Sequence, residues 1–259
     1  MATRRVGPDR KRFGDYVIVE EPLEIRLDGN LVATTMRTPG HDFELAVGFC
    51  HAEGLLVDNG VRTIRYCATG SALATRYNVV TVDTDRPSRK APTPRLGLTT
   101  SACGVCGSDA IDALCDRLLP LDTPAIPEPA VAGAVDAAVR SAQSLFTKTG
   151  SVHGAASFNV LTGELGPVRE DIGRHNAVDK VVGRLQLDGA LPADGLGLFV
   201  SGRASFEMVQ KGWAAGFACV LAVGGPSSLA VATARAANLG LAAFARGENC
   251  TIYSPERSR

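Results

Sequence analysis

The sequence predicts an α/β fold, in which a sheet covered by helices follows a β-rich N-terminal subdomain. Strand-like and helix-like runs alternate through the last third of the chain, a pattern typical of parallel strands joined by right-handed crossovers. The earlier region carries short apolar runs around turn residues, which is typical of hairpins. We therefore expect a basic disordered arm over residues 1–14, the β-rich subdomain over 15–98 and the α/β domain over 99–259.

The composition argues against several classes of protein. Of 259 residues, 45% are hydrophobic and 21% are charged, as in a globular protein with a full core. Lys+Arg and Asp+Glu both number 27, so we expect neither nucleic acid nor membrane as a partner. No apolar run approaches the roughly 18 residues that span a bilayer. The Arg4-Arg5 pair lacks the apolar segment of a secretion signal, and seven scattered cysteines indicate reduced thiols in the cytoplasm.

The β-rich region should begin with a hairpin over 23–38, which turns at Asp28 and Gly29. Asp42 can cap the helix that follows, and Gly54 can end it. The buried face of this helix is expected to hold Phe43, Ala46, Val47 and Cys50.

A strand over 77–84 and an exposed loop over 85–95 are expected next, since the loop holds three prolines and four basic residues. The basic residues either form a solvated surface or dock an acidic partner. They are Arg86, Arg89, Lys90 and Arg95.

The candidate reactive residues are Cys103 and Cys106, in the glycine-rich stretch "SACGVCGS". Glycines leave both thiols accessible, and a helix expected from Ser108 or Asp109 would stabilise a thiolate at its N-terminus. That helix should bury Ile111, Leu114, Cys115 and Leu118. Cys50, Cys115 and Cys219 fall on apolar helix faces or in a buried strand, so we expect them in the core.

A metal site at the cysteine pair is not expected. A structural zinc site needs four ligands, and the sequence has no second CxxC and no HxxxH. Zinc deaminases combine H-x-E with P-C-x-x-C, and this chain has His51-Ala52-Glu53. However, Ala102 replaces the proline, and His51 falls near the end of its predicted helix. A thioredoxin-like motif usually follows the first strand of a compact βαβ unit, whereas this pair lies mid-chain behind a long basic loop.

A proline-rich link over 120–129 and an alanine-rich helix up to Thr149 and Gly150 come next. The segment 168–183 then holds a polar cluster just before an amphipathic helix whose apolar face holds Val178, Val181, Val182 and Leu185. Burying so many polar residues is costly unless they are paired. The cluster therefore predicts a site or an interface. Its polar members are Asp171, Arg174, His175 and Asn176, around Gly173.

Two loops in the last third resemble anion-binding turns. Residues 200–207 and 223–230 each run from a strand through glycine into a helix, where backbone N–H groups and serine hydroxyls can bind phosphate. Either loop could equally be an ordinary tight turn. The side chains in question are Arg203, Ser205, Ser227 and Ser228, with Arg246 after the last strand.

The chain resembles the formate dehydrogenase accessory sulfurtransferases, or FdhD sulfur carriers. The matching segments are "SACGVCG", "TGSVHGAASF", "VREDIGRHNAVDKVVG", "SGRASFEMVQKGWAAG" and "PSSLAV", in that order. The resemblance implies a cytidine-deaminase-like fold without the zinc. It also implies that a cysteine desulfurase supplies sulfur as a persulfide. The sulfur then passes to the molybdenum or tungsten bis(guanine dinucleotide) cofactor of formate dehydrogenase.

By the same resemblance, Cys103 carries the persulfide and Cys106 is its partner. The cofactor is the bound substrate, a GDP- or GMP-like nucleotide could occupy its site, and a homodimer is expected. Residues implied in cofactor binding are Arg203, Ser205, Ser227, Ser228, His175 and Asn176, together with the stretch Phe244, Ala245, Arg246, Gly247, Glu248 and Asn249.

The chain departs from the family pattern at two places. It has Gly150-Ser151-Val152-His153 where two glycines are usual before the histidine, and "GGPSS" in place of "SAPSS". Both changes keep glycine or serine chemistry. A cofactor-binding chaperone without sulfur transfer stays an alternative function, and a zinc-dependent deaminase is a more distant one.

Overall fold

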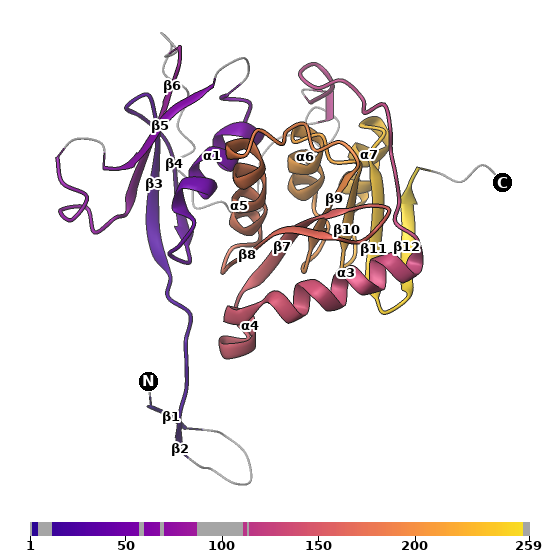
Figure 1. Cartoon of the computed structure of the whole chain (residues 1–259), viewed down its shortest axis with the longest axis horizontal. Helices are drawn as coiled ribbons and strands as arrows, with labels where there is room; N and C mark the ends of the chain where they lie inside the picture. Colours follow the sequence, from indigo (N-terminus) through magenta and orange to yellow (C-terminus); the bar gives the residue numbers. More distant parts are fainter. Residues whose placement is uncertain are drawn as a thin grey trace.

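A computed structural model describes residues 2–4, 12–56, 60–67, 70–86, 111–112 and 114–255. Its larger sheet has six strands in the order β12-β11-β10-β9-β7-β8 (Figure 1). β9, β10 and β11 run parallel, whereas β7, β8 and β12 join them by antiparallel pairing. The strands are β7 (His153–Asn159), β8 (Leu165–Asp171), β9 (Leu196–Val200), β10 (Cys219–Ala222), β11 (Gly240–Arg246) and β12 (Asn249–Ser254).

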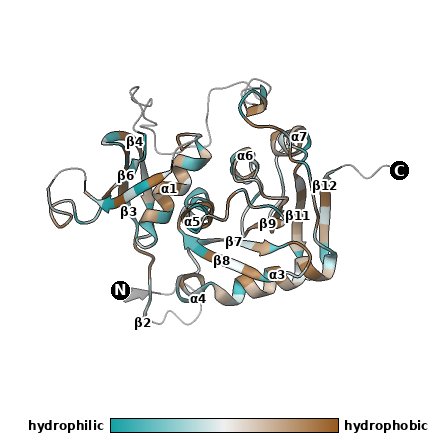
Figure 2. Cartoon of the chain, turned by 45° about the horizontal axis from the view of Figure 1, so that its top comes forward, coloured by the Kyte–Doolittle hydropathy of each residue, from teal (hydrophilic) through white to brown (hydrophobic). Residues whose placement is uncertain are grey.

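Helices cover both faces of this sheet (Figure 1). Alternate residues of a strand therefore enter different cores: Phe199 packs on the α3 side, whereas Leu198 and Val200 pack against the opposite helices. α3 alternates between hydrophobic and hydrophilic residues along its length, as a helix with one buried face should (Figure 2). The helices are α3 (Pro129–Ala142) on one face and α5 (Arg174–Leu187), α6 (Phe206–Ala214) and α7 (Ser228–Ala236) on the other.

The N-terminal part forms a second sheet of four strands, in the order β4-β3-β6-β5. β3 and β4 make a hairpin, and β3 pairs in parallel with β6. Helix α1 (Asp42–Ala52) covers one face, where Leu23 and Ile25 are buried with Leu45. The strands are β3 (Glu21–Leu27), β4 (Asn30–Arg37), β5 (Val61–Tyr66) and β6 (Val79–Thr84).

Helices α1 and α5 join the two sheets by packing directly on each other (Figure 1). A Cβ atom on Gly48 would lie 1.8 Å from the carbonyl oxygen of Asp179, and one on Gly183 would lie 1.8 Å from that of Glu44. Any larger residue would force the helices apart. Glycine at these two positions therefore sets the helix–helix distance.

The structure confirms the predicted fold class and the elements on which the prediction depended. β9, α6, β10, α7 and β11 alternate as expected. Asp28 and Gly29 both have positive φ, 48° and 83°, as a two-residue hairpin turn requires. Gly54 follows α1 with φ of 73°. The predicted boundary between residues 98 and 99 lies outside the described residues.

Two helix predictions are wrong. Asp42 does not cap α1 but is its first residue. Its carboxylate accepts two hydrogen bonds from Arg37, and His41 occupies the N-cap position. The alanine-rich helix is not continuous to Thr149. It breaks at Gln143, whose ψ of 82° is not helical, so that α3 is followed by the short α4 (Ser144–Thr149).

A third correction concerns Cys115, which is exposed although its predicted helix face is apolar. Among the described residues of that turn, only Leu114 is buried with the α5–α7 core, and Leu118 is partly buried there. The buried face is therefore narrower than the sequence predicts.

The N-terminal arm contains a short antiparallel pair, β1 (Ala2–Arg4) and β2 (Arg12–Gly14), which lies away from both sheets (Figure 1). The remainder of the predicted arm over 1–14 lies outside the described residues. Within the described part of the chain, no helix combines the length and the apolar character needed to cross a membrane.

Candidate functional site

The loops that follow β9 and β10 are tied together at one edge of the larger sheet. Gly224 N donates to Gly202 O at 2.8 Å, and Ser227 N donates to Ala204 O at 3.1 Å. Ala204 and Pro226 also form an isolated parallel bridge. The two predicted anion-binding loops therefore extend the sheet beyond its strands and hold their glycines in fixed positions.

A cavity of about 840 Å³ lies between this edge and helices α3 and α4. That volume is in the range of roughly 300–1,000 Å³ typical of small-molecule sites. Ser201, Val223 and Arg246 line it from the sheet edge. The remaining lining residues are Asp136, Arg140, Gln143, Phe146, Gly150, Ser151, Val152, His153, Phe199 and Gly247.

Cationic side chains line this cavity. Arg246 is exposed to it and pairs with no carboxylate among the described residues. Among the described residues, the side chain of Arg140 forms an ion pair only with the carboxylate of Asp136, at 3.4 Å. Burial lowers the pKa of His153, and the charge of Arg174 lowers it further, so this imidazole is neutral at pH 7. The cavity therefore suits an anionic ligand.

Two buried polar atoms near the same edge lack hydrogen-bond partners among the described residues. They are Arg174 Nε and Ser205 Oγ. Arg174 begins α5, and its Cδ would lie 3.9 Å from a Cβ atom on Gly202. Ser205 is the N-cap residue of α6, yet its hydroxyl makes no capping bond. Because unpaired buried polar atoms are costly, both favour an anion at this edge.

The predicted cofactor segment 244–249 forms the end of β11 and the turn into β12. Phe244 is 47% exposed and has a positive φ of 56°. Its ring covers Gly225, where a Cβ atom would lie only 2.6 Å away. Of this segment, Arg246 and Gly247 line the cavity.

Other predicted cofactor residues lie outside the cavity lining. Ser227 caps α7, since its hydroxyl accepts from Ala230 N at 3.1 Å. Ala245 is buried in the core on the α3 side. The exposed residues of this group are Arg203, Ser227, Ser228, Glu248 and Asn249.

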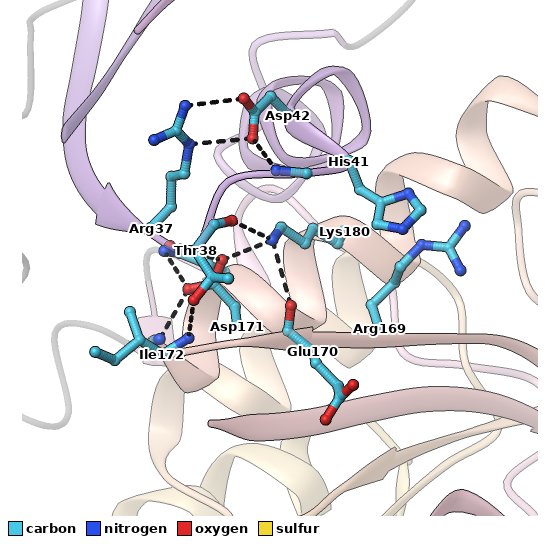
Figure 3. Close-up of polar contacts among 12 residues, drawn as sticks. Arg37, Thr38, His41, Asp42, Arg169, Glu170, Asp171, Ile172 and Lys180 are labelled. Carbon is cyan, nitrogen blue, oxygen red and sulfur yellow. Dashed lines mark hydrogen bonds and ion pairs between the residues drawn. The ribbon is translucent and has the colours of Figure 1, made fainter. Parts of the chain in front are cut away.

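Most of the polar segment 168–183 forms a junction between the two sheets, and Figure 3 shows its contacts. Asp171 is fully buried and pairs with Lys180 at 2.7 Å. Thr38 N donates to Asp171 Oδ2 at 3.1 Å, and Lys180 Nζ donates to Thr38 O at 3.0 Å. Gly173 N donates to the other oxygen of Asp171 at 2.8 Å. The end of β4 is thereby fixed to the start of α5.

Arg37 extends the junction into the smaller sheet. It is 1% exposed and donates two hydrogen bonds to the carboxylate of Asp42, at 3.1 and 3.0 Å (Figure 3). It also donates to Glu21 at 3.3 Å and to Asn78 at 3.0 Å. This guanidinium is well paired, as a buried charge must be.

His175 and Asn176 line a separate, smaller cavity of about 40 Å³ at the junction. His175 Nε2 lies 2.5 Å from Glu207 Oε2, and this bond lowers the pKa of Glu207. The amide of Asn176 donates to a carbonyl of β4 at 2.8 Å. Asp179 and Lys211 pair at 2.6 Å, and burial raises the pKa of Asp179. The structure therefore separates these two predicted cofactor residues from the large cavity.

The predicted catalytic residues Cys103 and Cys106, like Arg89, Lys90 and Arg95 of the basic loop, lie outside the described residues. Two other cysteines are buried as predicted. Burial raises the pKa of Cys219 to about 12 and also raises that of Cys50, so neither is a reactive thiol at neutral pH. His51 Nε2 donates to the carbonyl oxygen of Ala214 at 3.0 Å, which is a structural contact.

The sequence did not indicate the wall of the cavity that α3 and α4 provide. Asp136, Arg140 and Phe146 lie in an alanine-rich stretch that predicts only a helix with one buried face. The signal that could have found this wall is the motif over 150–153, which directly follows α4 and also lines the cavity.

Comparison with known proteins assigns the chain to a family. The model described as the FdhD/NarQ family matches residues 18–259. The chain belongs to this family. A relative from Corynebacterium efficiens, named sulfur carrier protein FdhD, is 47% identical over 251 residues, which cover 93% of this chain and 90% of the relative. A protein of the same name from Mycobacterium tuberculosis is 45% identical over 253 residues, with 93% and 90% covered.

A solved structure from Desulfotalea psychrophila, designated a formate dehydrogenase accessory protein, shares the fold. The TM-score is 0.77 at 23% sequence identity, and the match covers 99% of this chain and 96% of that one. The arrangement of a helix-covered sheet with a β-rich N-terminal part is therefore that of a known FdhD/NarQ-type structure.

Proposed function

We propose that this protein is a sulfurtransferase that accepts sulfur from a cysteine desulfurase and delivers it to the molybdenum or tungsten bis(guanine dinucleotide) cofactor of formate dehydrogenase in the cytoplasm. The observation that carries the proposal is a nucleotide-sized, cation-lined cavity in a chain that also has a glycine-flanked CxxC pair. The relatives named sulfur carrier proteins support the transfer step.

Sulfur transfer uses the chemistry of thiol–disulfide exchange. The thiolate of Cys103 attacks the terminal sulfur of the donor persulfide. A new S–S bond forms at Cys103, the donor's S–S bond breaks, and the donor leaves as a thiolate. Cys106 then either holds the sulfur in turn or attacks the inner sulfur and releases hydrosulfide. The second route leaves a disulfide, which a cellular thiol must reduce before the next cycle.

The large cavity would hold the cofactor, which is the substrate. Arg246 can bind its phosphates without giving up an existing ion pair among the described residues. Arg174 Nε and Ser205 Oγ, which are buried without partners in the described structure, supply further donors at the same edge. Charge-assisted hydrogen bonds of this kind are the strongest that a protein offers to a phosphate.

The experiment is mass spectrometry of the purified protein after incubation with a cysteine desulfurase and cysteine. Wild-type protein should gain the mass of one sulfur atom, whereas Cys103→Ala should not, and it should also fail to support formate dehydrogenase maturation. Cys115→Ala is the matched control, since Cys115 is exposed but outside the CxxC pair. Normal maturation of formate dehydrogenase with Cys103→Ala would exclude Cys103 as the residue that carries the sulfur. Cofactor binding without any gain of sulfur would indicate a chaperone instead.

A further inference from the structure

We propose that residues 16–19, in the segment that leads into β3, pair as an added strand with the outer edge of β5 in a second copy of this chain. Two copies that exchange these residues symmetrically form a closed dimer. This assembly depends neither on sulfur transfer nor on a bound cofactor, so it stands apart from the proposed function.

Residues 16–19 have the sequence Tyr-Val-Ile-Val, which favours an extended strand. Tyr16 is 75% exposed, Val17 is 60% exposed and Val19 is 55% exposed. No hydrogen bond joins the backbone of residues 17–19 to another described residue. Figure 1 shows this segment as extended chain that leaves β3 and runs away from both sheets. An exposed apolar segment with an unpaired backbone can bind by adding to the edge of a sheet.

The edge that suits such a strand is β5, at the end of the four-stranded sheet. Among the described residues, β5 pairs with β6 alone, and no hydrogen bond reaches its backbone from another element. Side chains do donate to the backbone of the other three edge strands of the two main sheets. The accepting carbonyl oxygens belong to Met36 in β4, Glu170 in β8 and Tyr253 in β12. β5 therefore keeps a row of backbone groups for a further strand.

The core of the smaller sheet is also incomplete at this edge. Val61, Ile64 and Tyr66 of β5 pack against its buried residues, but they are themselves only partly buried. Side chains of an added strand alternate between the two faces of the sheet. One of the two rows of residues 16–19 would therefore cover these three side chains and extend the core.

The charges on the two segments are complementary. β5 carries Arg62 and Arg65 and no carboxylate, whereas Asp15 and Glu20 flank residues 16–19, and no basic residue lies between them. Charges at the rim of an interface orient the partners more than they add affinity. Here they favour pairing of β5 with this segment over pairing of β5 with another β5.

The segment cannot reach β5 of its own chain. In the order β4-β3-β6-β5, a strand outside β5 lies three strand spacings from β3, which is about 14 Å. Only Glu20 separates Val19 from β3, which begins at Glu21, and one residue spans at most about 3.6 Å. The strand that pairs with β5 must therefore come from another copy.

The test measures dimerisation of the full chain by analytical ultracentrifugation over a range of concentrations. A double variant, Val17→Asp with Ile18→Asp, places a charge on each row of the segment. Its dissociation constant should rise about 10-fold or more, because one charge would have to leave water in the paired strand. Both residues lie outside the hydrophobic cores, so the fold should be unaffected. The control is Leu161→Asp, an 85% exposed residue in the turn between β7 and β8, which should change nothing.

Hydrogen exchange locates the interface. The amides of residues 16–19 and of β5 should exchange more slowly as the protein concentration rises, because both gain hydrogen bonds in the dimer. A chain that stays monomeric up to about 100 μM would overturn the inference. A dimer that the double variant leaves unchanged would also overturn it, as would a dimer in which residues 16–19 gain no protection. None of these results bears on sulfur transfer, which the mass measurement tests separately.

Discussion

The junction between the two sheets and the edge of the large cavity are both rich in charged residues. The charges are paired at the junction, whereas some at the cavity edge are not. At the junction, Asp171 and Lys180 are 0% and 1% exposed and satisfy each other and the neighbouring backbone. Among the described residues, Arg246 in the cavity has no carboxylate partner, and Arg174 Nε at the neighbouring sheet edge has no hydrogen-bond partner.

This difference separates residues that hold the fold from residues available to a ligand. The segment 168–183 contributes to both regions, because Asp171 and Lys180 face the junction whereas Arg174 lies beside Gly202 at the cavity edge. In the sequence, the residues that hold the fold and those available to a ligand lie in one equally polar segment. Only the pairing in three dimensions distinguishes them.

Breaking the junction should have the largest effect. Lys180→Met leaves the carboxylate of Asp171 buried without its partner, so the free energy of unfolding should fall by about 3–5 kcal/mol, measured by urea denaturation. Asp188→Asn is the control, because its pair with Arg184 at the end of the same helix is exposed and should contribute less than about 1 kcal/mol. Similar losses in both variants would contradict the comparison.

Removing charge from the cavity edge should spare the fold. Arg246→Gln should weaken GDP binding by about 10-fold or more, because a charged donor to phosphate is lost, while the free energy of unfolding changes by less than about 0.5 kcal/mol. Calorimetry and urea denaturation measure the two effects. Arg62→Gln, an exposed arginine of the smaller sheet, should change neither. A large loss of stability in Arg246→Gln would show that Arg246 supports the fold, as the junction residues do.

The smallest effect is expected at the bond between His175 and Glu207. This bond lowers the pKa of Glu207 in the folded state, so its stabilisation is present above the ordinary value of 4.5 and is lost as the pH falls through the lowered pKa. Glu207→Gln should therefore cost about 1 kcal/mol at pH 7, since the pair is only partly buried.

In acid denaturation profiles, the difference in stability between wild type and Glu207→Gln should shrink as the pH falls below 4.5. A difference that stays constant with pH would show that the bond does not depend on the ionised carboxylate.

The features of the fold that local sequence patterns determine were predicted from the sequence. The alternation of β9, α6, β10, α7 and β11 follows from apolar periodicity, and the hairpin turn follows from Asp28 and Gly29. The contact of Thr38 with Asp171 joins residues 133 positions apart, and no local pattern records it.

The candidate site was predictable only in part. Arg246 follows a predicted strand, so its place at the carboxyl edge could be inferred. Asp136 could not be placed, because whether a polar residue of α3 meets solvent or a cavity depends on how the helix lies across the sheet. Likewise, His175 and Asn176 turned out to line the junction cavity because of the direction in which α5 begins.

The contact of Gly48 and Gly183 has a mechanical consequence. Main-chain atoms of α1 and α5 touch there with no side chain between them, so nothing at the crossing can change rotamer to absorb a displacement. A force applied to the four-stranded sheet by a docked protein would therefore be transmitted along α5 to Arg174, which lies beside Gly202 at the edge of the larger sheet.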